Sequence, residues 1–125
     1  MAADTLPARV LIVEDDFLIR LTLAEALADE GYTVSEASSG EEALVLVAAD
    51  LAGIALVLTD IQLGSAMNGL EFALGLREIA PHLPVIFMTG RPDALAGRLT
   101  ARDRLIAKPY LPSQICALAR ELLAT

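Results

Sequence analysis

The 125-residue sequence has one cysteine, one histidine, no tryptophan and only 4% aromatic residues. A single cysteine, Cys116, excludes a disulfide within the chain and fits a reducing compartment. Because the only imidazole, His82, falls in an expected loop far from Cys116, a zinc site is not expected. We expect Cys116 to be a small apolar residue of the last helix and His82 to be plain polar surface.

Long apolar runs and positive charge are also scarce. No stretch approaches the roughly 20 apolar residues that cross a bilayer, and Met1 to Ala8 lack the features of a signal peptide. We therefore expect a cytoplasmic protein without membrane insertion. Nine Lys and Arg against 17 Asp and Glu give a net charge of −8, which disfavours direct binding to nucleic acid. With 55% hydrophobic residues, we expect a flexible leader over 1–7 and one domain over 8–125.

Short apolar strands alternate with amphipathic helices along the chain. We expect strands over residues 9–13, 32–37, 54–60, 83–89 and 104–107. We expect helices over residues 16–30, 38–49 and 92–99, and from 68 and 112 onward. Five strands alternating with five helices predict a parallel sheet covered by helices on both faces, the doubly wound α/β class.

Local signals suggest where the helices begin and which faces they bury. Asp16 and Asn68 are expected N-caps, and Ser38 with Glu41 has the spacing of a capping box. Helical periodicity gives two expected apolar faces: Phe17, Leu18, Leu21, Ala24 and Ala28 in the first helix, and Leu111, Ile115, Leu118 and Leu122 in the last.

Polar side chains collect where the strands end. Glu14 and Asp15 follow the first strand, Asp60 ends the third, Thr89 ends the fourth and Lys108 follows the fifth. In an open parallel sheet these ends share one edge, where ligands bind. Clustered carboxylates repel one another and favour a cation, and an oxygen-only ligand set suits Mg²⁺. Beside such an ion, Asp60 is a candidate nucleophile toward a phosphodonor.

These residues carry a family resemblance. The sequence resembles the receiver domain of a two-component response regulator in four motifs that occur in the family's order: Val13-Glu14-Asp15-Asp16, Leu58-Thr59-Asp60, Phe87-Met88-Thr89-Gly90 and Lys108-Pro109-Tyr110. The resemblance covers residues 8–123. It implies a flavodoxin-like (βα)5 fold with a five-stranded sheet in the order 2-1-3-4-5.

The resemblance also implies a role for each matching residue. Asp60 would be the phosphoacceptor. Mg²⁺ would be bound directly by Asp15 and Asp60, through water by Glu14, and by the main-chain carbonyl of Gln62.

On the same resemblance, Thr89 and Lys108 would contact the phosphoryl group, and the peptide bond before Pro109 would be cis. The implied phosphodonor is a histidine kinase or a histidine phosphotransfer protein. The implied output is a downstream protein bound in trans, with homodimerisation as a further option. Catalysis would be limited to self-phosphorylation and autodephosphorylation, so the chain is not expected to be an enzyme.

The sequence departs from the family at three places. Leu105 stands where many members have an aromatic switch residue, Gly64 stands where many have proline, and the stretch from Thr89 to Lys108 is short. The motifs around Thr89 and Lys108 resemble a subgroup with a Phe-Ala-Thr-Gly motif. Arg91 is a candidate to shape water access to the phosphoryl group, and Tyr110 is expected to be half-buried.

Two other functions fit parts of the pattern. A Mg²⁺-dependent phosphatase with an aspartyl nucleophile is disfavoured, because such enzymes carry two Asp close together after the first strand and need a cap for substrate selection. A constitutive partner-binding module with a vestigial site is the second alternative. The retained Asp60, Thr89 and Lys108 argue against it, whereas Leu105 leaves it open.

Overall fold

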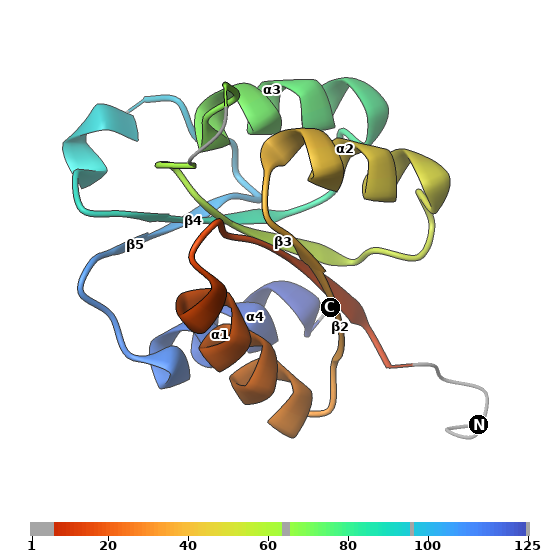
Figure 1. The fold of residues 1–125 in the computed structure, drawn as a ribbon, viewed down its shortest axis with the longest axis vertical. Coiled ribbons are helices and arrows are strands. Elements are labelled where there is room, and N and C mark those ends of the chain that lie inside the picture. Colours follow the sequence, from red (N-terminus) through yellow and green to blue (C-terminus); the bar gives the residue numbers. More distant parts are fainter. Residues whose placement is uncertain (1–6, 64–65, 96, 125) are drawn as a thin grey trace.

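A five-stranded parallel sheet forms the centre of the molecule (Figure 1). The computed structural model describes residues 7–63, 66–95 and 97–124. The sheet order is β2-β1-β3-β4-β5, which confirms the predicted order. Reversal of the strand order between β1 and β3 places a switch point there. The strands are β1 (Arg9–Val13), β2 (Thr33–Ala37), β3 (Leu56–Asp60), β4 (Val85–Thr89) and β5 (Arg104–Ala107).

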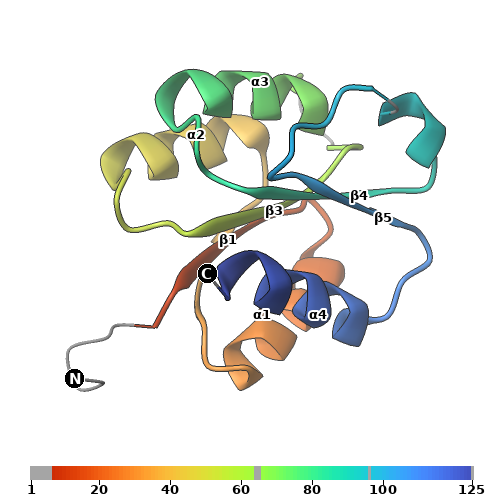
Figure 2. The same cartoon turned by 180° about the vertical axis from the view of Figure 1, so that it is seen from behind.

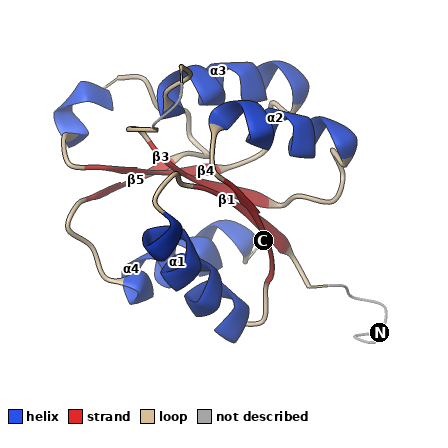
Figure 3. Cartoon of the chain, in the orientation of Figure 1, coloured by secondary structure: helices blue, strands red, loops and turns tan. Residues whose placement is uncertain are grey.

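Helices cover both faces of this sheet. The described residues form four α-helices and one 3₁₀ turn: α1 (Phe17–Asp29), α2 (Gly40–Ala49), α3 (Gly69–Ile79), η2 (Pro92–Leu95) and α4 (Pro112–Leu123). Figure 2 shows α1 and α4 together on one face, and Figure 3 shows α2 and α3 on the other. This layering confirms the predicted doubly wound architecture.

Side chains alternate between two hydrophobic cores, because successive residues of a strand point to opposite faces. Leu11, Val57 and Phe87 pack under α2 and α3. Ile12 and Leu58 pack against α1 and α4. The three central strands are therefore apolar along nearly their whole length, as strands covered on both faces are.

The predicted apolar face of α1 is wrong except for Ala24, which is buried. Leu23 and Leu27 are buried with it, whereas Leu18 is 70% exposed and Phe17 61%. Apolar residues lie all round this helix, so their spacing does not single out one face. Packing against the sheet selects the buried face, and leaves large apolar side chains of the first turns in solvent.

Two other helix predictions need correction. Ser39, not Ser38, is the N-cap of α2, and its hydroxyl accepts from the N–H of Glu42 at 3.1 Å. The Glu42 carboxylate then accepts from the N–H of Ser38, so the reciprocal pattern is displaced by one residue. Leu111 is the exposed N-cap of α4 and not part of its buried stripe. Asp16 and Asn68 are N-caps as predicted.

The helix expected over residues 92–99 is only the 3₁₀ turn η2. Gly97 adopts φ +77°, a left-handed conformation that ends a helical path. The predicted leader falls outside the described residues except for Pro7, and so does Gly64. Within the described residues, no helix has the length and apolar character to cross a membrane.

Candidate functional site

The carboxyl ends of four strands bring the predicted site residues to one edge of the sheet. β3 pairs with β4 so that Asp60 lies opposite Met88, and Thr89 lies opposite Ala107 of β5. The N–H of Lys108 donates to the Thr89 carbonyl at 2.8 Å, which carries the β5 pairing one residue further. The register of the parallel strands therefore fixes the positions of Asp60, Thr89 and Lys108 relative to one another along the strand direction.

Asp60 is a buried carboxylate, 3% exposed, held at both oxygens. Oδ1 accepts from the N–H of Gln62 at 2.9 Å. Oδ2 accepts from Nζ of Lys108, which is the only lysine in the sequence. The main-chain N–H of Gln62 thus contacts the carboxylate. The family resemblance implies that the carbonyl of the same residue binds the metal.

Glu14 lies beside Asp60 and is even more deeply buried, at 1% exposed. Its Oε2 accepts from the N–H of Asp16 at 3.0 Å. Its Oε1 is the one buried side-chain polar atom among the described residues that has no hydrogen-bond partner. A buried carboxylate oxygen without a donor costs free energy unless a proton or a bound cation supplies the missing positive charge.

Burial raises the pKa of Glu14 to about 7. A hydrogen bond from the Asp16 backbone opposes this rise, and the neighbouring carboxyls of Asp15 and Asp60 add to it. Asp15 and Asp60 therefore both lie close enough to interact with the Glu14 carboxyl, although Asp15 itself is exposed.

These observations fit a hard divalent cation. All donors are oxygen atoms, and the unpaired Glu14 oxygen faces an acid-rich edge. The described residues contain no ready-made group of three acidic, His or Cys side chains in metal-binding positions. Mg²⁺ does not need such a cage, because it is held through one or two carboxylates and keeps several waters.

Thr89 is buried, and its hydroxyl already makes one hydrogen bond. Its Oγ1 accepts from the N–H of Arg91 at 3.0 Å, which leaves its own proton available to a ligand oxygen. Arg91 is exposed, and its role in water access stays a prediction. Leu105 is half-buried and packs against the core under α2 and α3, and the bond between Lys108 and Pro109 is cis, as predicted.

An open apolar groove adjoins the site. It has a volume of about 600 Å³ and runs between α1 and the segment after β5. Its lining consists of Leu18, Ile19, Thr22, Leu23, Lys108, Pro109, Tyr110 and Pro112. Tyr110 is half-buried, as predicted. Burial raises its pKa to about 12, and the nearby charges of Glu14 and Asp60 contribute.

Sequence reasoning missed two residues that shape this site. A Cβ on Gly69 would lie 2.2 Å from the Asp60 carbonyl oxygen, so only glycine lets α3 begin so close to the end of β3. The capped start of α3, with glycine directly after Asn68, is the signal that was available. Arg20 donates to the Glu14 carbonyl at 2.8 Å, and no motif pointed to it.

Known proteins resemble this chain in sequence. The family model described as response regulator receiver domain matches residues 10–120. Response regulator MprA of Mycolicibacterium vanbaalenii is 33% identical over 121 residues, which cover 94% of this chain and 51% of that protein. The chain thus spans about half the length of the curated relatives it matches.

Solved structures agree with the sequence comparison. A response regulator receiver protein from Sinorhizobium medicae superposes with a TM-score of 0.86 at 25% identity, covering 95% of this chain and 96% of that one. The receiver domain of NtrX from Brucella abortus gives a TM-score of 0.83 at 30% identity, covering 93% and 98%. On its fold, its strand-end residues and these matches, the chain belongs to the response regulator receiver domain family.

Proposed function

We propose that this chain is a phosphorylation switch that accepts a phosphoryl group on Asp60 in the presence of Mg²⁺. One observation carries the proposal: the buried Asp60 carboxylate contacts Lys108 and lies beside a Glu14 oxygen that lacks a partner. This combination provides a nucleophile, a cation for the phosphoryl oxygens and a place for a metal. The phosphodonor is a phosphohistidine of a histidine kinase or histidine phosphotransfer protein, and the reaction takes place in the cytoplasm.

Each residue has a defined part in the transfer. A carboxylate oxygen of Asp60 forms a bond to phosphorus while the bond from phosphorus to the donor imidazole breaks, and the imidazole leaves with that electron pair. Lys108 and the free proton of Thr89 donate to phosphoryl oxygens. Bound Mg²⁺, held by Asp15, Asp60, the Gln62 carbonyl and, through water, Glu14, would neutralise charge on the transferring group. Attack by water on phosphorus later releases phosphate and restores the carboxylate.

The output of this switch is binding in trans. Donation to a phosphoryl group draws Thr89 toward Asp60 and moves the Lys108 ammonium from the carboxylate to the phosphoryl oxygens. Thr89 accepts a hydrogen bond from the segment that leads into η2. The surface formed by η2, β5 and α4 is therefore the part we expect to change and to bind a downstream protein or a second copy. Turnover is limited to phosphorylation and dephosphorylation of the chain itself, so we do not propose an enzyme of other substrates.

Intact-mass spectrometry with Mg²⁺ and acetyl phosphate tests the proposal. We expect the mass of one phosphoryl group, dependent on Mg²⁺, in the wild type and no gain in D60N. A matched control is D103N, because Asp103 is a second buried aspartate among the described residues, and it should still be phosphorylated. Absence of both the mass gain and Mg²⁺ binding in the wild type would favour the partner-binding module with a vestigial site.

The apolar groove supports docking of the donor protein next to Asp60. Lys108, which contacts Asp60, also lines the groove, so an apolar helix seated there brings its phosphohistidine to the site. In phosphotransfer profiling against the histidine kinases of the host genome, L18E should slow transfer at least tenfold. V45E is the control, because Val45 is 69% exposed on α2, across the sheet. Both variants should react normally with acetyl phosphate, which needs no docking.

A further inference from the structure

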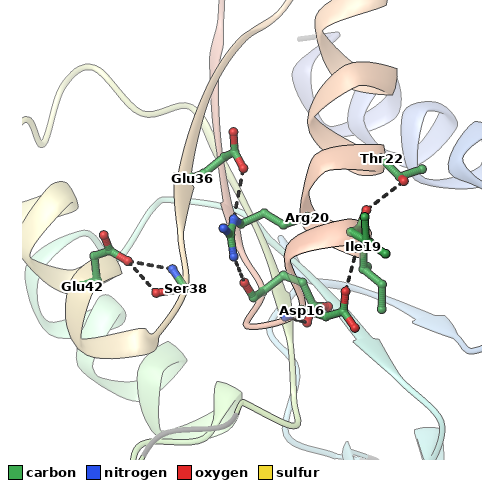
Figure 4. Close-up of polar contacts among 9 residues, drawn as sticks. Asp16, Ile19, Arg20, Thr22, Glu36, Ser38 and Glu42 are labelled. Atoms are coloured by element: carbon green, nitrogen blue, oxygen red, sulfur yellow. Dashed lines mark hydrogen bonds and ion pairs between the residues drawn. The ribbon is translucent and has the colours of Figure 1, made fainter.

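One side chain outside the predicted site holds the main chain of its acidic loop. Arg20 lies on α1, and its Nη1 donates to the Glu14 carbonyl at 2.8 Å. Its Nε donates to Oε1 of Glu36 at 3.0 Å. Figure 4 shows Arg20 between Glu36, on β2, and the main chain that leads into Asp16. Arg20 therefore ties α1 to the ends of two strands.

The surroundings of Arg20 keep its guanidinium in one orientation. Its side chain is only 16% exposed, and the Phe17 ring centre lies 5.6 Å from its Cζ. A planar guanidinium presents donors in a rigid fork, so it can serve two acceptors that lie in different directions. A lysine ammonium on a flexible stem does not fix this geometry.

The contact completes a set of bonds around Glu14. The Glu14 N–H donates to the Ala37 carbonyl at 3.0 Å, its carbonyl accepts from Arg20, and Oε2 accepts from the Asp16 N–H. Oε1 is the polar atom of Glu14 that remains without a partner. The residue is thus held at every polar position except the one that faces the proposed cation.

The bond to Arg20 also acts on the next residue. The Glu14 carbonyl belongs to the peptide plane that joins Glu14 to Asp15, so fixing this oxygen fixes the plane from which the Asp15 side chain departs. Without Arg20, that plane could rotate, because Asp15 is exposed and the described contacts show no other bond to this carbonyl.

We propose that Arg20 is a positioning residue for the divalent cation, acting through the Glu14 carbonyl. It sets the direction in which Glu14 and Asp15 face Asp60, and so determines metal affinity rather than the transfer step. The inference rests on the proposed Mg²⁺-dependent function. Outer-shell partners of metal ligands are typically worth about 10–100-fold in metal affinity.

The test is a Mg²⁺ titration of ¹⁵N-labelled protein without phosphodonor, followed at the amides of Asp15 and Asp16. We expect R20Q to bind Mg²⁺ about tenfold or more weakly than the wild type. E36Q weakens the ion pair but leaves the bond to the Glu14 carbonyl, so its Kd should stay within about twofold. R20K should fall between R20Q and the wild type, because it keeps the charge but not the fork.

R120Q is the matched control, because Arg120 is also an arginine in an ion pair but lies away from the site. Arg120 is on α4, and its Nη1 lies 2.8 Å from Oε1 of Glu30 at the end of α1. Its Mg²⁺ affinity should equal that of the wild type. A dispersed amide NMR spectrum shows that a variant is folded. If R20Q is unfolded, the Mg²⁺ affinity of R20K decides whether Arg20 has the positioning role.

The positioning role would be overturned if a folded R20Q bound Mg²⁺ as tightly as the wild type. If R20Q is unfolded, the same result in R20K would overturn it. In both cases the proposed function would stay intact. Loss of affinity in E36Q as large as in R20Q would also overturn it, because the ion pair would then be the cause. No Mg²⁺ binding by the wild type would instead reject the proposed function, and this inference with it.

Discussion

Lys108 reaches from the end of β5 and donates to the carboxylate of Asp60 at the end of β3. The two residues are 48 positions apart in the sequence, and β4 lies between their strands in the sheet. Asp60 is buried, whereas the Lys108 side chain is about one-third exposed. The ammonium therefore supplies the positive charge that the buried carboxylate needs, from a position still open to solvent.

Removal of Lys108 should destabilise the metal-free protein. In EDTA, we expect K108A to lower the free energy of unfolding by about 1.5–3 kcal/mol, because Asp60 would lose its cationic partner. Mg²⁺ should stabilise K108A more than the wild type, since the ion then replaces the ammonium. Urea denaturation with and without Mg²⁺ measures both effects. In the D60N background, the K108A substitution should lower the free energy of unfolding by less than it does in the wild type. An equal decrease in both backgrounds would rule out the charge explanation.

The stability of the metal-free protein should depend on pH through Glu14. Its pKa is raised by burial to about 7 in the folded chain, so the folded state holds a proton that the unfolded state has already released. The stabilisation that this proton provides is therefore complete below about pH 4.5 and is lost as pH rises toward and through 7, by about 3 kcal/mol in total. Denaturation in EDTA at pH 5 and pH 8 should show this loss in the wild type and a smaller one in E14Q.

Two glycines of α3 should respond in opposite ways to alanine. In G69A the new methyl would meet the Asp60 carbonyl and the Ile61 main chain, so we expect a loss of about 1–3 kcal/mol in stability. In G75A the methyl meets only the Leu44 side chain, at 3.3 Å, and alanine favours a helix by up to about 1 kcal/mol. Thermal unfolding of both variants compares them, and equal losses would contradict the close approach at Gly69.

The hydroxyl of Thr89 should be needed for the response but not for phosphorylation. We expect T89V to gain the phosphoryl mass with acetyl phosphate and Mg²⁺, because the nucleophile is intact. Without a hydroxyl to donate to the phosphoryl group, the amide NMR signals of Arg91 and β5 should shift much less than in the wild type. T89S restores the hydroxyl and should restore the shifts, and full shifts in T89V would disprove the coupling.

The sequence predicts the sheet and the strand-end residues well because both depend on local patterns. Alternating apolar runs and breaks define the five strands, and parallel pairing then brings Glu14, Asp60 and Lys108 to one edge without further information. The N-caps Asp16 and Asn68 follow from short-range hydrogen bonding for the same reason.

The missed features depend on contacts between distant segments. Leu18 and Leu23 are equally apolar, and only packing on the sheet decides that Leu23 is buried. Arg20 resembles any helix-surface arginine until Glu36 and the Glu14 carbonyl are placed beside it. Adjacent Ser38 and Ser39 offer two registers for a cap, and the geometry of the turn after β2 selects Ser39.

Because Lys108 is the only lysine, the protein has a single side-chain primary amine, and it lies in the proposed site. Reductive methylation with ¹³C-formaldehyde would label this amine and the chain's α-amine, and the methylated lysine keeps its charge. The Lys108 methyl signal would then follow the contact with Asp60 directly. A single resonance could thus report occupancy of the site by a cation, a phosphoryl group or neither, in a mixture with unlabelled partner proteins.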